Sequence, residues 1–254
     1  MIKFLANNFV DSALITATSE NAQYPISNIN DDRRTKTYRS LSDSDSLIFD
    51  LGMIEAVDSF AIVSNWQNGF GVTSLTLEAN GSTDFTSPAF TTTIELDSTY
   101  GIGIKEFTEQ SYRYWRLVCT STLGYCELAN MFIGKSDKIL TNGVGYNWAF
   151  TNKDLKNVST NRYGQEFIDY KTTRKELTNV TYSIMDSTEM DILQNAYDNV
   201  TTVKPCFIYF PLEVDGIVSN DNRYNGMYRF ISPLLVENVN SGYFNTSLAL
   251  RECK

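Results

Sequence analysis

The sequence contains no histidine, and it has fewer basic than acidic residues. Without histidine, Ser-His-Asp and Cys-His catalytic groups, the HExxH zinc helix and any imidazole general base are excluded. The chain of 254 residues has 21 Lys and Arg against 30 Asp and Glu, so its net charge is −9. This balance disfavours sequence-independent nucleic-acid binding, which needs a basic surface. We therefore expect a binding or structural protein, or a hydrolase that works with carboxylates alone.

No segment has the pattern of a signal peptide or a membrane span. Met1–Val10 has one Lys and a short apolar run that Asn7 and Asn8 interrupt, without a small-residue cleavage site. No run approaches the ~18 apolar residues of a spanning helix. The four cysteines form no CxxC motif, so we expect buried free thiols and no metal or other cofactor: Cys119, Cys126, Cys206 and Cys253.

Short β-branched and aromatic runs alternate with Asn, Asp, Ser and Gly along the chain, which predicts a mainly β protein. In the first half the predicted strands are Leu47–Leu51, Phe60–Ser64, Ser74–Ala79, Thr91–Leu96 and Tyr114–Cys119. In the second half they are Tyr163–Tyr170, Thr178–Ile184, Cys206–Phe210, Met227–Ser232 and Tyr243–Leu250. Regular short strands with polar turns are typical of sandwiches and barrels.

The strand pattern breaks near Gly134–Lys138, and a single helical pattern follows in the second half. We predict two domains, residues 1–136 and residues 137–254. Asp186-Ser-Thr-Glu189 has the form of a capping box. The apolar stripe behind it, with Leu193 and Ala196 at its centre, predicts an amphipathic helix at about 187–200 that packs against a sheet.

The first half resembles the discoidin, or galactose-binding-like, family in the order of its local motifs. These are Ala13–Ser19 (ALITATS), Pro25–Asp32 (PISNINDD), Thr35–Ser40 (TKTYRS), Ile48–Gly52 (IFDLG), Tyr112–Leu117 (YRYWRL) and Cys126–Gly134 (CELANMFIG). Tyr38 stands where the family pattern has Trp. The resemblance implies a jelly-roll-like sandwich in which Arg113 and Arg116 satisfy carboxylates or carbonyls beside the sheet. It also implies that ligands meet loops at one end, here Glu20–Pro25, Asp31–Lys36 and Asn65–Phe70.

These loops contain the candidate residues for binding a glycan or a partner protein: Trp66, Gln67, Asn68, Phe70, Arg33 and Arg34. An aromatic ring flanked by amides suits stacking on a sugar while hydrogen-bonding its hydroxyls. Alternatively, Trp66 is buried at the strand end or lies in a protein interface. Four loop carboxylates could supply oxygen ligands for calcium, but they lack EF-hand spacing, so we expect solvated side chains: Asp31, Asp32, Asp43 and Asp45.

Residues 138–254 resemble tail-tube-like and distal-tail proteins of tailed bacteriophages in their order of elements. The pattern runs from Gly143–Trp148 (GVGYNW) through strands and the capped helix to Lys204–Phe210 (KPCFIYF) and Leu248–Glu252 (LALRE). The resemblance implies a ring-forming module, in which exposed strand edges extend sheets between subunits. Candidate interface residues are Tyr209, Tyr224, Tyr228 and Tyr243, with packing inside the monomer as the alternative.

The leading hypothesis is a phage virion structural protein, a ring-forming tail, neck or baseplate component assembled in the host cytoplasm. Its N-terminal sandwich would decorate the exterior and contact neighbouring phage proteins or host glycans. The alternative is a carbohydrate-binding adhesin without a ring role. An enzyme is not expected: Asp186 and Glu189 are explained by helix capping, and no GxSxG, P-loop or Rossmann pattern is present.

Overall fold

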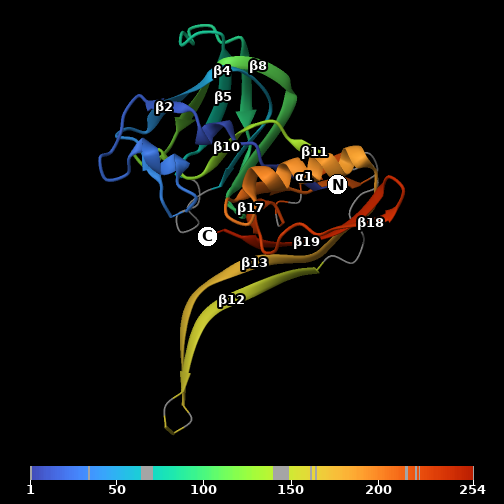
Figure 1. Cartoon of the computed structure of the whole chain (residues 1–254). Helices are drawn as coiled ribbons and strands as arrows, with labels where there is room; N and C mark the ends of the chain where they lie inside the picture. Colours follow the sequence, from blue (N-terminus) through green and yellow to red (C-terminus); the bar gives the residue numbers. More distant parts are fainter. Residues whose placement is uncertain are drawn as a thin grey trace.

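The computed structural model describes the chain except for residues 1, 34, 64–70, 140–148, 161, 164, 215–216, 221, 223 and 254. A β-sandwich lies beside a second β unit that contains one α-helix. A long hairpin projects from this second unit (Figure 1). The prediction of a mainly β chain, with an N-terminal sandwich and one amphipathic helix in a β-rich C-terminal half, is confirmed. Among the described residues, no helix has the length and apolarity to cross a membrane.

The sandwich is built on a seven-stranded antiparallel sheet that two long strands run through. It comprises β2 (Leu14–Ala17), β4 (Ser44–Val63), β5 (Ser74–Asn80), β6 (Phe90–Ile94), β7 (Leu96–Asp97), β8 (Ile102–Thr120) and β10 (Met131–Gly134). A small sheet of β3 (Tyr38–Arg39) and β9 (Glu127–Leu128) joins it, as do the 3-10 turns η1 (Phe9–Asp11) and η2 (Ile26–Asn30).

The runs predicted as separate strands at Leu47–Leu51 and Phe60–Ser64 are joined in one strand, β4, which contains residues 47–51 and 60–63, while Ser64 lies outside the described residues. The β4–β8 register shifts between Asp50 and Glu55 and again before Ser59. Such irregularities bend a strand, so β4 and β8 serve both layers of the sandwich. At the first bend, Arg113 Nε and Nη2 donate to the Asp50 carboxylate at 2.7 and 2.8 Å, which confirms the predicted supporting role of this arginine.

The second unit is built on an eight-stranded antiparallel sheet in the order β11-β1-β14-β17-β19-β13-β12, with β18 also paired to β19. Its strands are β1 (Ile2–Leu5), β11 (Asp137–Ile139), β12 (Ala149–Thr160), β13 (Glu166–Met185), β14 (Cys206–Tyr209), β17 (Gly226–Phe230), β18 (Val236–Asn240) and β19 (Tyr243–Glu252). A separate two-stranded hairpin is formed by β15 (Pro211–Val214) and β16 (Ile217–Asn220).

The first strand of the chain belongs to the second unit. β1 pairs with β11 on one side and with β14 on the other. The predicted division at residue 136 therefore assigns β1 to the other unit, because local composition does not show which sheet a strand joins. Since β1 and β11 are neighbours, the whole sandwich is an insertion between two adjacent strands of the second sheet.

Helix α1 (Ser187–Val200) matches the predicted helix in position and in its buried face. The side chain of Asp186 accepts a hydrogen bond from the Glu189 amide at 2.8 Å, which satisfies one free N–H at the helix start. Leu193 and Ala196 are fully buried against the second sheet. The helix thus covers one face of that sheet.

The sandwich covers the other face, because successive residues of the strands at the junction point into different cores. In β4, Phe60 and Ile62 point into the sandwich core, whereas Ala61 points toward the second sheet. In β10, Phe132 also points toward the second sheet. It packs against Phe207 of β14, and the centroids of the two rings are 6.4 Å apart. The junction is therefore a third apolar core shared by both units.

Replacing Phe132 with Ala should destabilise the whole protein rather than one unit. The side chain is fully buried in the shared core, and removing such an aromatic costs about 3–5 kcal/mol. Urea unfolding followed by circular dichroism measures the loss. The matched control is Leu41→Ala, because Leu41 is 66% exposed on the same unit and should change stability by less than about 0.5 kcal/mol. Similar effects for both variants would contradict the shared core.

Candidate functional site

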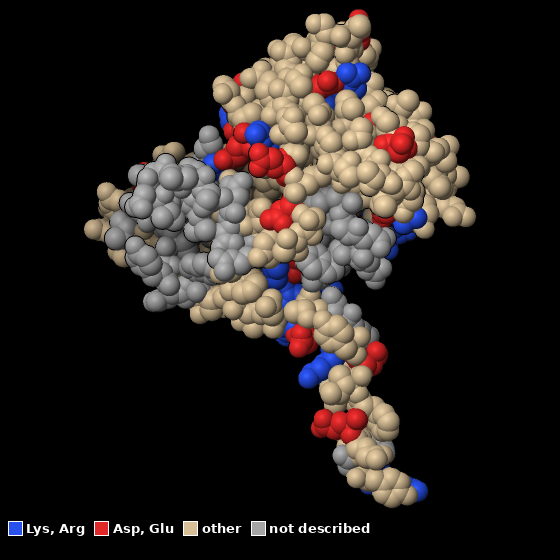
Figure 2. All heavy atoms as spheres, turned by 180° about the vertical axis from the view of Figure 1, so that it is seen from behind, with Lys and Arg blue, Asp and Glu red and all other residues tan. Residues whose placement is uncertain are grey.

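The hairpin formed by β12 and β13 extends well beyond the rest of the second sheet. β13 pairs with β19 from Glu176 to Met185, whereas its residues Glu166–Lys175 pair with β12 alone. At roughly 3.3 Å per residue, these ten positions give a two-stranded ribbon of about 33 Å. Figure 2 shows this ribbon projecting from the body of the molecule.

The projecting ribbon carries apolar side chains in contact with solvent. Val158 lies directly opposite Ile168 in the register, so the two form a cross-strand pair on one face. Ile168 is 57% exposed, and Phe167, Tyr170 and Tyr163 are at least as exposed. An isolated two-stranded ribbon is marginally stable in water, and grouped exposed apolar residues mark interaction surfaces. This surface is the first candidate site.

The four tyrosines predicted at a subunit interface occupy different environments. Tyr228 is 0% exposed, and its hydroxyl donates to the Tyr224 carbonyl at 2.7 Å. Tyr209 is 4% exposed, and burial raises its pKa to about 12. These two belong to the chain's own core, which corrects the expectation that they face a neighbour. Tyr224 is half-buried against Phe150, and only Tyr243 of the four is largely exposed, at 47%.

The second candidate site lies where several loops of the sandwich meet around Arg39. The Arg39 guanidinium lies over the Tyr24 ring at 4.0 Å and the Tyr125 ring at 5.1 Å. Its Nε is 3.2 Å from the buried carboxylate of Glu127. The Glu127 amide donates to the Gly71 carbonyl, and a Cβ on Gly71 would lie 2.2 Å from the Glu127 Cβ. Only glycine fits there, so Gly71 packs closely against Glu127 of this cluster.

Most of the predicted loop residues lie outside the described residues: Trp66, Gln67, Asn68, Phe70 and Arg34. Arg33 is described and exposed, and its guanidinium binds the Asp31 carboxylate through Nε at 2.8 Å and Nη2 at 2.6 Å. These hydrogen bonds lower the pKa of Asp31 to about 2. Arg33 lines a cleft between the sandwich and the second sheet.

Three of the four loop carboxylates considered as calcium ligands have other partners. Asp31 is bound by Arg33, and Asp32 is 3.9 Å from Arg229. Asp45 is buried, where it accepts hydrogen bonds from the Tyr38 hydroxyl and the Ser19 amide. Within the part of the chain that the structure describes, no three acidic or thiol side chains are grouped as metal ligands would be.

Two carboxyl groups interact at the junction of the units, where Asp58 of β4 lies near Asp137 of β11. Asp58 accepts hydrogen bonds from the Ser136 amide at 2.7 Å and from the hydroxyls of Ser136 and Ser59. Burial, with a smaller contribution from the charge of Asp58, raises the pKa of Asp137 to about 6. Because both Asp58 oxygens accept these hydrogen bonds, this carboxylate supports the junction of the two units.

The comparisons with known proteins find structural likeness only. No protein-family model and no curated protein sequence matches the chain. One similar solved structure is the family 32 carbohydrate-binding module of Clostridium perfringens NanJ in complex with galactose, with 18% identity over 52% of this chain and 98% of that one, at a TM-score of 0.43.

Two other solved structures are similar to the same extent. A chitosan-binding module from a Paenibacillus chitosanase/glucanase has 20% identity over 50% of this chain and 98% of that one, at a TM-score of 0.39. A fucose-binding module from Streptococcus pneumoniae has 13% identity over 50% of this chain and 96% of that one, at 0.43. With TM-scores below 0.5, these likenesses do not establish a function for this chain.

Asp137→Asn should stabilise the protein at pH 7 and flatten its stability between pH 4 and 6. The pKa of Asp137 is about 6 in the folded protein against 3.8 for the free group. The folded state therefore retains a proton that the unfolded chain has lost, and this group's contribution to the free energy of unfolding falls as pH rises through that range. Since solvent partly screens the site, we expect a gain of about 1 kcal/mol at pH 7.

Urea titrations at several pH values measure this dependence. Asp191→Asn is the matched control, because it removes the same charge from an exposed position on α1. A pH profile of Asp137→Asn that follows the wild type between pH 4 and 6 would show that the carboxyl does not hold the extra proton.

Proposed function

We propose that this chain is a structural assembly protein that uses the β12–β13 hairpin as an arm to bind another copy of itself. The main observation behind this proposal is that Glu166–Lys175 pair with β12 alone, while apolar side chains on the same two strands are exposed to solvent. Burying Val158, Ile168 and Tyr170 against a second copy would remove this surface from water, at roughly 25 cal/mol for each Å² of apolar area. The arm would gain the packing that its own chain does not supply.

The edges of the second sheet support the same proposal. In the order of that sheet, β12 stands at one end and β11 at the other. An edge strand offers unpaired N–H and C=O groups to another chain. A contact between unlike edges of two copies is head-to-tail, and such contacts close into a ring when the rotation permits. Sheet extension through β12 would therefore place the arm against the next subunit.

The form of assembly that we propose is a ring in the tail, neck or baseplate of a bacteriophage, formed in the host cytoplasm with other virion proteins. The support for this form is the sequence pattern of residues 138–254, which resembles that of tail-tube-like and distal-tail proteins. The insertion of the sandwich between β1 and β11 fits this arrangement. A domain inserted at one sheet edge decorates an assembly without interrupting the remaining strands.

Light scattering behind a sizing column should show a discrete oligomer for the wild type and a monomer for Ile168→Asp. The new carboxylate would have to be desolvated in the arm's interface, so association should weaken by at least about tenfold. The matched control is Ile54→Asp, because Ile54 is 70% exposed at the bend of β4, on the sandwich.

The control should keep the wild-type mass. A wild type that stays monomeric at its highest soluble concentration would contradict self-assembly. Equal loss of the oligomer in both variants would show that the arm has no special part in it.

A second candidate function is glycan binding by the sandwich, and the Arg39 cluster favours it. The guanidinium lies beside two half-buried tyrosine rings, Tyr24 and Tyr125, and Gly71 packs against Glu127 in the same cluster. Aromatic faces stack on sugar rings while an arginine donates hydrogen bonds to their oxygens. The proteins named above bind galactose, chitosan and fucose, and the proposal for this chain rests on the cluster alone.

A glycan array should identify a bound polysaccharide or host glycan, and Tyr125→Ala and Trp66→Ala should each weaken that binding about three- to tenfold. This range follows from the loss of one aromatic contact. Tyr163→Ala serves as the control, because Tyr163 is an exposed tyrosine on the distant hairpin. Retained binding in both loop variants would refute this site, as would the absence of any bound glycan.

A further inference from the structure

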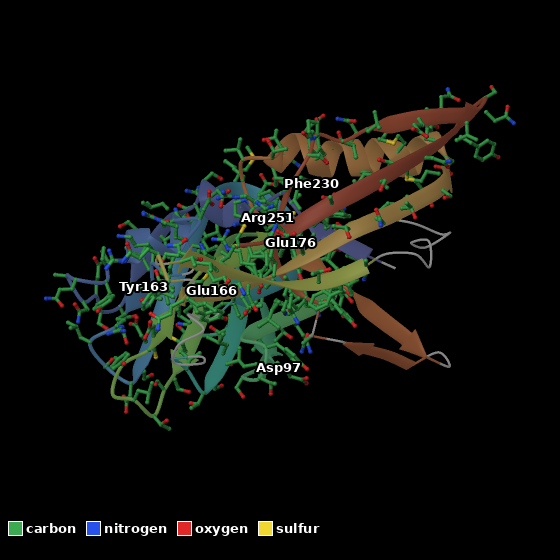
Figure 3. All side chains as sticks on the ribbon, turned by 90° about the horizontal axis from the view of Figure 1, so that it is seen from below. Asp97, Tyr163, Glu166, Glu176, Phe230 and Arg251 are labelled. Atoms are coloured by element: carbon green, nitrogen blue, oxygen red, sulfur yellow. The ribbon has the colours of Figure 1, made fainter. Side chains whose placement is uncertain are left out.

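A row of charged side chains continues the shared core on the face of the second sheet that the sandwich covers. In β17, Met227 packs in the shared core, and Arg229, two residues later, points to the same face. Arg251 of β19 lies directly opposite Arg229, and Glu176 of β13 lies opposite Arg251. Figure 3 shows Glu176 and Arg251 beside each other on neighbouring strands.

The charged row lines a cleft of about 480 Å³ between the two units. From the second unit it is lined by Arg174, Arg229, Arg251 and Glu252, and from the sandwich by Asp32 and Arg33. Burial raises the pKa of Cys253 at the cleft to about 11, while the charges of Arg229 and Arg174 act in the opposite direction. Cys253 and both arginines line the same cleft.

The positive charge in the cleft exceeds the negative charge available to pair with it. Arg251 donates to Glu176 at 2.8 Å, and the Glu252 carboxylate accepts from the Lys175 amide at 3.0 Å. Arg229 has Asp32 at 3.9 Å, which is beyond hydrogen-bond distance. Among the described residues, half-buried Arg174 has no carboxylate within 4.0 Å. Arg174 therefore has no ion pair with a described residue, and Arg229 has only a long one.

Arg174 and Arg229 also have guanidinium nitrogens that lack a hydrogen-bond partner within the part of the chain that the structure describes. The Nε atoms of Arg174 and Arg229 are buried and have no hydrogen-bond partner among the described residues. A buried donor of a charged group that is left without a partner destabilises the folded protein. Two arginines directly opposite each other on adjacent strands, Arg229 and Arg251, also repel. An anion between these side chains would remove both costs.

We propose that this cleft binds an oxyanion, the carboxylate or phosphate group of a small ligand, between the guanidinium groups of Arg174 and Arg229. Arginine presents donors in a planar fork that matches both groups, and such hydrogen bonds are about twice as strong as neutral ones. The volume of the cleft leaves room for a body larger than a bare ion, such as an acidic sugar. Arg174 lies at the base of the hairpin arm, but the site uses neither the exposed apolar residues of the arm nor the residues of the Arg39 cluster.

Isothermal titration and thermal unfolding with inorganic phosphate test the site in the full-length protein. Phosphate at saturation should raise the melting temperature by about 2–4 °C relative to sodium chloride of equal ionic strength. Acetate and glucuronate serve as carboxylate ligands for comparison. If phosphate binds more tightly than both, the ligand carries a phosphate group. If glucuronate binds more tightly than phosphate and acetate, the ligand is a sugar acid.

Arg174→Gln should weaken phosphate binding at least about tenfold, because it removes one fork of charged donors. Arg229→Gln is the second variant and should have the same effect. The control is Arg162→Gln, which removes an equal charge from an exposed position near the hairpin end and should bind phosphate like the wild type. Equal stabilisation by chloride, or unchanged binding in both cleft variants, would overturn the proposal.

Discussion

The structure depends on strands that are buried on both faces at the junction of the two units. In β4, β10 and β14, successive side chains point into different cores, because residues along a strand alternate between its faces. A strand of this kind cannot lose either neighbour without exposing every second apolar residue. The helix, the second sheet and the two layers of the sandwich are thereby stacked in one order.

This stacking also determines which parts of the second sheet are left uncovered by the rest of the chain. The sandwich covers only part of the second sheet, and beyond its margin Arg229 and Arg251 replace the apolar residues of the same strand face. Farther out, β19 ends its pairing with β13 at Glu176, and the two-stranded ribbon continues without support. The cleft and the arm thus both begin where the sandwich stops covering the second sheet. The cleft contains arginines that are incompletely paired, and the arm has apolar side chains exposed to solvent.

The position of the sandwich within the chain gives it freedom to carry a separate function. Because it is inserted between β1 and β11, its loops around Arg39 belong to a unit whose removal would leave the order of the other strands unchanged. The residues that line these loops do not contribute to the pairing of the second sheet. Assembly through the arm and ligand binding by the sandwich are therefore compatible in one molecule.

Local pattern in the sequence was sufficient for the features that depend on neighbouring residues. The helix from Ser187 to Val200 follows from its cap and its 3.6-residue periodicity, and most strands follow from alternation. Only the tertiary structure decided that β1 joins the second sheet, that Tyr228 is core, and that Arg174 and Arg229 line one cleft. Alternation shows that one face of a strand is buried, but the partner that buries it comes from residues far along the chain, and no local period encodes that pairing.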